Sequence, residues 1–219
     1  MCGRYTITLD PGDFELELGV GDFPSDFEKR YNVAPTQQVA VVRDPESRKV
    51  EWLKWGLIPY WAKDPAIGAR MINARSETLA EKPSFKQSFL KRRCLILADG
   101  FFEWQKNEGK ASTPYYVKLR SSKPFAFAGL WDRWHPSDDI DVVSCTIITC
   151  PPNELIAPIH DRMPVMFGKD TLWNWLQPAP VEELEKQLQP YPSELMQAYP
   201  ISKMINNAQF DSPEVLRPA

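Results

Sequence analysis

The sequence of 219 residues lacks the features that mark membrane and secreted proteins. No apolar run approaches the ~20 residues that a membrane-spanning helix needs. The first residues also lack the charged region followed by an apolar stretch that characterises a secretory signal. We therefore expect a cytoplasmic protein without a membrane partner.

Cysteine and histidine are scarce, with four Cys and two His in the chain. Cys94 and Cys145 lie in apolar, strand-like segments, which predicts buried reduced thiols. Disulfides are not expected in a reducing compartment. The interval between Cys145 and Cys150 also lacks the tight paired spacing of structural zinc sites. We expect neither a metal nor a cofactor.

The chain has no excess of positive charge, since its formal net charge is −3. This net charge does not indicate nucleic-acid binding, although a local basic patch can outweigh the net charge of the whole surface. One basic cluster comprises Lys86, Lys91, Arg92 and Arg93. By itself this cluster predicts only the solvated face of a helix.

Glycine is also sparse, with 10 residues against 21 Pro. Proline near twice its usual share of ~5% favours many short elements and fixed loops over long helices. The chain contains no repeat and no linker long enough to separate domains. We expect one monomeric domain over residues 1–219, with a loose tail from Gln209 onward.

Alternating and apolar segments predict seven or more strands and few helices. Strands are expected at residues 4–9, 39–43, 50–58, 93–105 with a break at 99–100, 114–120, 124–134, 142–150 and 199–205. Short helices are expected at residues 11–18, 83–93, 169–176 and 181–188. Structured loops are expected at residues 29–38, 55–64 and 151–164, the second of which displays aromatic faces. The pattern indicates a mainly β, α+β fold with a small closed or partly closed barrel or sheet and peripheral short helices.

The first four residues, Met1-Cys2-Gly3-Arg4, could carry unusual chemistry. If Met1 is removed, Cys2 presents a free α-amine two bonds from the carbon that bears its thiol, a 1,2-aminothiol that no internal cysteine can offer. A cysteine at position two is nevertheless more often an inert residue at a frayed end. Any functional interpretation therefore depends on other parts of the chain.

Two ionisable residues lie in settings that suit proton transfer. Glu103 is bracketed by Phe102 and Trp104, and a carboxyl held against aromatic surface has a raised pKa. His160 lies in a loop beside Asp161 and Arg162, a common setting for a proton-transfer group. Each residue also has an ordinary interpretation, since Glu103 could point outward from a strand and His160 could simply face solvent.

Three further polar or aromatic residues could contact a nucleic acid. Asn73 and Arg75 are two positions apart, so on an extended stretch both side chains point the same way. Asn can hydrogen-bond a backbone or an oxyanion, and Arg can grip a phosphate in bidentate fashion. Trp61, in a loop bounded by proline, could stack on an unpaired base or could belong to the core.

Taken together and in order, these segments resemble the SRAP family of SOS response-associated peptidase-like proteins. Six ordered blocks at suitable spacings make this pattern far more specific than one short motif. The blocks are MCGRY, RYNVAPTQ, WGLIPYWAK, INARSET, RCLILADGFFEW and IHDRMPV. Members of the family often carry two adjacent tryptophans after the proline of the aromatic loop, whereas here Trp61 is followed by Ala62.

The resemblance implies a sensor of abasic sites in single-stranded DNA that protects the lesion during the DNA damage response. It implies loss of Met1 and a stable thiazolidine crosslink between Cys2 and the ring-opened sugar, and a mainly β fold with a small barrel. It also implies a cytoplasmic protein that associates with the nucleoid when it acts on DNA. Carried over residue by residue, the catalytic pocket comprises Cys2, Asn73, Glu103 and His160. The implied DNA contacts are Arg4, Asn32, Trp61, Arg75 and Arg162.

Other functions remain open from the residues alone. Proton abstraction next to an imine could cleave the strand, which would make the protein a lyase. Cys2, His160 and Glu103 could also serve a thiol peptidase or amidohydrolase, including one that removes its own Met1. A third alternative is a non-covalent single-strand binding module in which Cys2 is incidental.

Overall fold

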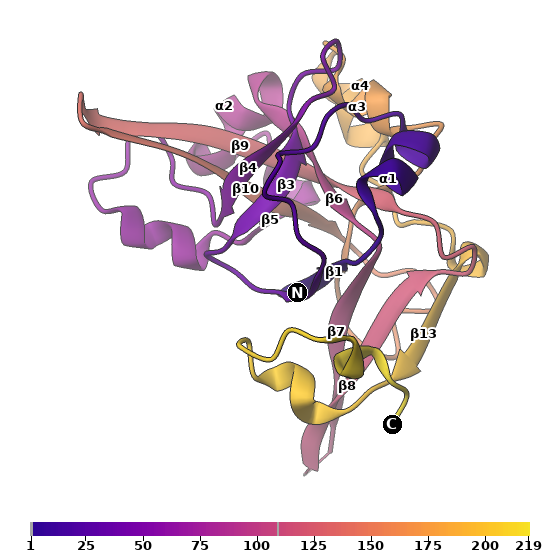
Figure 1. The fold of residues 1–219 in the computed structure, drawn as a ribbon. Coiled ribbons are helices and arrows are strands. Elements are labelled where there is room, and N and C mark those ends of the chain that lie inside the picture. Colours follow the sequence, from indigo (N-terminus) through magenta and orange to yellow (C-terminus); the bar gives the residue numbers. More distant parts are fainter. Residues whose placement is uncertain (1, 109) are drawn as a thin grey trace.

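The centre of the fold is a closed five-stranded β-barrel (Figure 1). The computed structural model describes residues 2–108 and 110–219. The ring closes because β10 pairs with both β9 and β4, while β3 and β6 complete the path between those two neighbours. The barrel strands are β3 (Gln38–Val42), β4 (Val50–Trp55), β6 (Arg93–Ala98), β9 (Phe125–Ser137) and β10 (Ile140–Cys150). The expected mainly β fold with a small closed barrel is confirmed.

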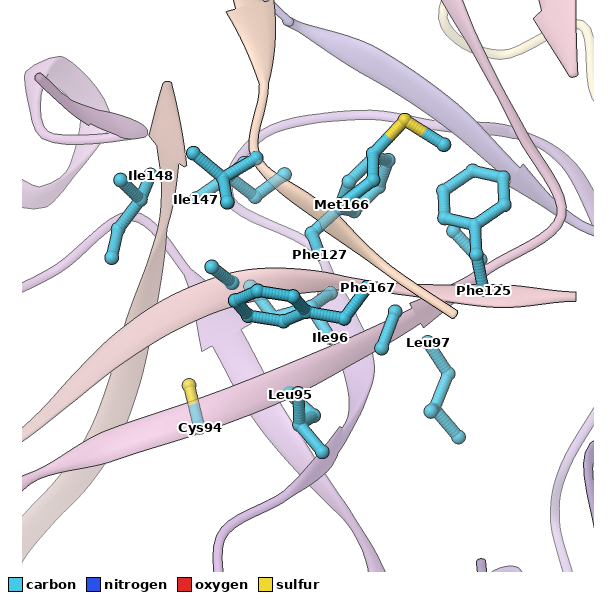
Figure 2. Close-up of a cluster of buried hydrophobic side chains, with 14 of the residues drawn as sticks. Cys94, Leu95, Ile96, Leu97, Phe125, Phe127, Ile147, Ile148, Met166 and Phe167 are labelled. Carbon is cyan, nitrogen blue, oxygen red and sulfur yellow. The ribbon is translucent and has the colours of Figure 1, made fainter. Parts of the chain in front are cut away.

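Strand β6 is buried along its whole length, as its continuous apolar sequence predicts. Cys94 faces Gly129 of β9 in the barrel register, and a Cβ atom at Gly129 would lie 2.8 Å from the Cys94 sulfur. Because Gly129 has no side chain, the Cys94 side chain on the neighbouring strand can pack directly against the backbone of β9. Figure 2 shows the side chains that β6, β9 and β10 contribute to this core, together with Met166 and Phe167.

Three short strands pair with the barrel strands β9 and β10. They are β5 (Asn73–Arg75), parallel to β10, β11 (Met163–Pro164), antiparallel to β10, and β12 (Met166–Phe167), antiparallel to β9. A second, five-stranded sheet lies beside the barrel in the order β13-β8-β7-β1-β2. Its strands are β1 (Arg4–Ile7), β2 (Arg30–Val33), β7 (Gly100–Asn107), β8 (Lys110–Leu119) and β13 (Met196–Pro200).

The chain passes from the barrel to the second sheet at Asp99, between β6 and β7. Gly100 follows as the first residue of β7. A Cβ atom at this position would lie 2.2 Å from the hydroxyl oxygen of Tyr116, so a side chain cannot be accommodated without displacing the tyrosine. The predicted break at Asp99-Gly100 therefore marks a change of sheet.

Short helices cover the outside of the two sheets. The α-helices are α1 (Pro11–Leu18), α2 (Pro83–Lys91), α3 (Leu172–Leu176) and α4 (Val181–Lys186). The 3₁₀ turns are η1 (Pro65–Arg70), η2 (Ser76–Thr78), η3 (Ser193–Leu195), η4 (Lys203–Asn206) and η5 (Pro213–Leu216). Helix α1 begins with Pro11 and ends before Gly19, whose φ of 67° suits glycine, and it buries Phe14 and Leu18.

Two local expectations need correction. Arg93 does not belong to a solvated basic face: it is 7% exposed and donates to the carbonyls of Phe89, Leu90 and Trp175, joining the ends of α2 and α3. Residues 29–38 are not a loop throughout, because residues 30–33 form β2 against β1. In both cases the stabilising partners are distant in sequence.

The segment from Gln209 is packed against the second sheet and is not a loose tail. Val215 is fully buried, and Ile201 and Pro218 form a β-bridge. Asp211 accepts hydrogen bonds from the backbone of Tyr31 and Asn32 and forms an ion pair with Arg30. One side chain thus replaces the missing neighbour at the edge of β2.

Among the described residues, no helix combines the length and the apolar character required to cross a bilayer.

Replacing Asp211 with Ala should destabilise the protein by about 1–3 kcal/mol, because the backbone donors of Tyr31 and Asn32 lose their acceptor. Urea unfolding measures this change. Asp138→Ala is the matched control, since Asp138 is exposed in the β9–β10 turn and its loss should change stability by less than about 0.5 kcal/mol. Equal stability of the two variants would contradict the packed position of this segment.

Candidate functional site

Cys2 lies two residues before the start of β1 and is fully buried, which is unusual for a residue so close to a chain end. Its backbone carbonyl accepts a 2.9 Å hydrogen bond from the Nδ2 atom of Asn73. Asn73 begins β5, which is held parallel to β10 with Asn73 level with Ile147. The barrel therefore presents an amide that fixes the backbone of Cys2.

Glu103 lies on β7 beside Cys2. Arg4 of β1 is paired with Phe102, so Glu103 comes level with the residues just ahead of β1. The Glu103 side chain is 1% exposed, and burial raises the pKa of its carboxyl from an ordinary value of 4.5 to about 7. Burial, reinforced by the charge of Glu103, also raises the pKa of the Cys2 thiol far above its usual range. The thiol is therefore protonated at neutral pH.

His160 completes this group from the connector between β10 and β11. Its Nε2 atom lies 3.9 Å from the Glu103 carboxylate, and its Nδ1 atom accepts a 3.0 Å hydrogen bond from the backbone amide of Arg162. The carboxylate of Asp161, which is 86% exposed, also lies 2.9 Å from Nδ1. We assign Nδ1 as an acceptor because the Arg162 amide can only donate. Burial lowers the pKa of His160, which favours the neutral ring with its proton on Nε2.

Two predicted DNA contacts, Arg4 and Asn32, are bound to each other. The Arg4 guanidinium donates to the Asn32 side-chain oxygen and to the Ile205 carbonyl, each at 2.8 Å. Asn32 is fully buried, and its amide nitrogen donates to the carbonyls of Asn207 and Phe210. Asn32 therefore supports Arg4 and the C-terminal segment from inside and does not present its side chain to a ligand.

Arg162 and Arg75 occupy different positions around the site. The Arg162 guanidinium forms a bidentate pair with Glu77 at 2.5 and 2.9 Å and donates to the Thr149 carbonyl at 2.6 Å. Its side chain is only 11% exposed. Arg75, by contrast, is exposed, and it lies on the same face of β5 as Asn73, while the intervening Ala74 is buried. The predicted common orientation of Asn73 and Arg75 is confirmed.

Trp61 is 47% exposed in the loop that follows β4, and its neighbour Tyr60 is 58% exposed. Asp132, which is 2% exposed, anchors this loop by accepting a 3.1 Å hydrogen bond from the Tyr60 amide. Asp132 also lies 3.4 Å from the Arg92 guanidinium. The loop thus displays two adjacent aromatic rings on a fixed backbone, as its sequence predicts for the aromatic faces.

Several residues that support the site escaped prediction. Glu77 and Thr149 hold Arg162, Asp132 anchors the aromatic loop, and Asp99 binds β1. Asp99 carried a signal, because an acid placed at the end of a continuous apolar strand must be buried or paired. The sequence around Glu77 and Thr149 carried no such signal, because their common partner, Arg162, lies 85 and 13 residues away.

Over residues 2–108 and 110–219, no three His, Cys, Asp or Glu side chains gather in a way that could hold a metal ion. The thiol of Cys2, the carboxyl of Glu103 and the imidazole of His160 are neighbours, but they are not arranged as metal ligands. Such a set can exchange protons and supply a sulfur nucleophile.

Comparisons with known proteins agree on one family. A sequence model of the SOS response associated peptidase (SRAP) family matches residues 1–208. The chain is 42% identical over 221 residues to the "Abasic site processing protein YoqW" of Bacillus subtilis, covering 99% of each chain. It is 29% identical to the "Abasic site processing protein HMCES" of Xenopus tropicalis, covering 99% of this chain and 78% of that one. An X-ray structure of a Bacteroides thetaiotaomicron protein is also similar, with a TM-score of 0.88 and 26% identity over the whole of both chains.

Replacing Glu103 with Gln should change how stability depends on pH. Because burial raises the pKa of this carboxyl, the folded state binds its proton more tightly than the unfolded state does between about pH 4.5 and 7. The wild type should therefore lose roughly 2–3 kcal/mol of stability through this group as pH rises across that interval, and Glu103→Gln should lack this component.

Urea unfolding at pH 4.5 and pH 8 measures the difference. Glu154→Gln, which changes an exposed carboxyl, should retain the wild-type dependence. If Glu103→Gln and wild type lose equal stability over the interval, the carboxyl does not have a raised pKa.

Proposed function

The chain belongs to the SOS response associated peptidase (SRAP) family, and on this basis we propose that it processes abasic sites in single-stranded DNA. In this proposal Met1 is removed first, and Cys2 then joins the ring-opened sugar as a thiazolidine. The covalent product shields the lesion. The names of the relatives from Bacillus subtilis and Xenopus tropicalis support abasic-site processing as the activity.

The observation that carries the proposal is the fixed and buried position of Cys2. A residue so close to a chain end is usually frayed, yet Cys2 is fully buried and bound through its carbonyl to Asn73. The neighbouring side chains are Glu103 and His160, both capable of proton transfer. A fixed position suits a reaction in which the amine and the thiol of Cys2 must both reach one carbon atom, as they must when the ring forms.

The proposed reaction joins an aldehyde and an aminothiol with loss of one water. The α-amine, with an ordinary pKa near ~8, is partly neutral at pH 7 and attacks the aldehyde carbon of the opened sugar. The resulting carbinolamine loses its hydroxyl as water and becomes an imine. The sulfur then adds to the same carbon, and the thiol proton leaves to a base. Because amine and thiol belong to one residue, closure of the five-membered ring benefits from a high effective molarity.

Glu103 suits the proton transfers around the imine. With a pKa of about 7, it is present in both protonation states at neutral pH. The protonated form can help the carbinolamine hydroxyl depart, and the ionised form can accept the proton of the Cys2 thiol, whose own pKa is raised by burial. His160 is neutral at rest, and in this proposal it takes a proton transiently from the nearby Glu103 carboxyl and passes it to the oxygen released when the sugar ring opens.

The DNA strand is proposed to cross the site between Arg75 and the aromatic loop. Arg75 is exposed and can reach a phosphate directly. Trp61 can stack on an unpaired base, which contributes about 1–3 kcal/mol per base, and Tyr60 stands next to it. Arg4 lies two residues from Cys2 and Arg162 two residues from His160. Both guanidinium groups already hold hydrogen bonds within the protein, so we propose that they attract a phosphate by their charge without leaving these partners.

Incubation with a single-stranded oligonucleotide that carries one abasic site should yield a denaturant-resistant adduct. Its mass should equal that of the Met1-free protein plus the DNA minus one water. Cys2→Ala should give no such adduct, whereas Cys150→Ala should retain it, because Cys150 is buried in β10 and takes no part in the reaction. Intact mass spectrometry makes both measurements.

An adduct that survives in Cys2→Ala would place the chemistry elsewhere. Turnover of peptides with no DNA adduct would instead favour a thiol hydrolase, and reversible binding alone would favour a non-covalent module.

Glu103→Gln and His160→Ala should slow different steps. Loss of Glu103 should delay both borohydride-trappable imine and final adduct, typically by 10²–10⁴-fold for a general acid–base group. Loss of His160 should delay ring opening, and an acyclic abasic-site analogue that carries a free aldehyde and cannot close a ring should restore its rate but not that of Glu103→Gln. Quenched time courses with and without borohydride separate these steps. Equal delay of the same step on both substrates would contradict this division of roles.

A further inference from the structure

We propose that Asp99 is a positioning residue for the crosslinking reaction, acting through β1 on the location of Cys2. This inference rests on the proposed function. Asp99 does not touch Cys2, and no step of the proposed chemistry uses it. Its carboxylate nevertheless accepts four hydrogen bonds from the N-terminal segment, donated by Thr6, Thr8 and Leu9.

The geometry around Asp99 forms a clamp on residues 6–9. Asp99 is 5% exposed at the crossing from the barrel to the second sheet. One carboxylate oxygen accepts from the Thr6 hydroxyl at 2.5 Å. The other accepts from the Thr8 amide at 2.5 Å, the Thr8 hydroxyl at 2.7 Å and the Leu9 amide at 2.9 Å. The Asp99 amide in turn donates to the Thr6 carbonyl at 3.0 Å.

Tyr116 extends the clamp across the second sheet. Its hydroxyl lies 3.0 Å from the Thr6 hydroxyl oxygen. Because the single proton of Thr6 is directed to Asp99, Tyr116 must be the donor in this second bond. The tyrosine ring occupies the space left by Gly100, so the clamp requires the Asp99-Gly100 pair as a unit.

The clamp acts together with the Asn73 bond to set the position of Cys2, because it fixes the register of the strand that carries Cys2 into the pocket. Strand β1 reaches the pocket through the pairs Arg4–Phe102 and Thr6–Gly100, and Cys2 lies two residues before Arg4. A slip of β1 by one residue would move Cys2 by about 3.4 Å and turn its side chain to the other face. Such a shift would break the 2.9 Å bond from Asn73 and separate the thiol from Glu103. Reacting groups tolerate far smaller errors.

Asp99→Asn tests this role because it keeps the shape and replaces one acceptor oxygen by a donor. In Asp99→Asn the amide NH2 cannot accept from the Thr6 hydroxyl, so that bond is lost or reversed, and the neutral amide oxygen left for Thr8 and Leu9 is a weaker acceptor than the carboxylate. At saturating abasic-site oligonucleotide, we expect the single-turnover crosslinking rate to fall by about 10²-fold, the cost of a displacement on the order of 1 Å. Affinity for the same strand carrying an unreactive tetrahydrofuran site should be unchanged.

Three further variants separate positioning from general stability. Leu184→Ala removes a fully buried side chain from α4, and at a temperature where it and Asp99→Asn are both folded it should crosslink at the wild-type rate despite its lower melting temperature. Thr6→Val should reproduce the loss of rate, whereas Thr6→Ser, which keeps the hydroxyl, should recover most of it. These Thr6 variants also provide the test if Asp99→Asn does not fold.

The outcomes distinguish this inference from the function on which it rests. If wild-type protein forms no adduct, the proposed function fails and Asp99 has no reaction to serve. If wild type forms the adduct and both Asp99→Asn and Thr6→Val form it as fast as wild type does, only the positioning role is wrong. The role is also wrong if Leu184→Ala loses as much rate as Asp99→Asn.

Discussion

The structure depends on one buried carboxylate that joins its two sheets. Asp99 lies where the chain leaves the barrel, and it holds Thr6, Thr8 and Leu9 of the N-terminal segment through four accepted hydrogen bonds. Leaving such a carboxylate unpaired in the interior would cost several kcal/mol, so β1 and Asp99 require each other. These hydrogen bonds tie the short strand β1 to the end of barrel strand β6, and they help to hold Cys2 in a fixed position.

The pocket that results controls protons mainly through burial. Burial raises the pKa of Glu103 to about 7, raises that of the Cys2 thiol, and lowers that of His160. In each case the neutral form is favoured, as expected when charged forms lose contact with water. At neutral pH the thiol and the imidazole are therefore uncharged while Glu103 occurs in both protonation states, which suits this carboxyl to carry protons between amine, thiol and water.

Much of the barrel could be predicted from sequence because its strands are apolar or alternate regularly, and α1 has clear start and stop signals. Strand β2 and the C-terminal segment could not, because Asp211 binds residues about 180 positions away. The pocket residues were each ambiguous alone, and only the resemblance of ordered blocks brought them together. The buried position of Asn32 was not foreseen either, since an Asn in a loop-like sequence carries no sign that a distant segment will cover it.

A crystal structure of the Met1-free protein after reaction with abasic single-stranded DNA provides the most direct test. We predict one sugar carbon bonded to both the nitrogen and the sulfur of Cys2, with Asn73 still donating to the Cys2 carbonyl and the Thr8 amide still bound to Asp99. A sugar carbon bonded to any other residue would contradict the central claim. So would a Cys2 that has left the pocket while Asp99 keeps its bonds to β1.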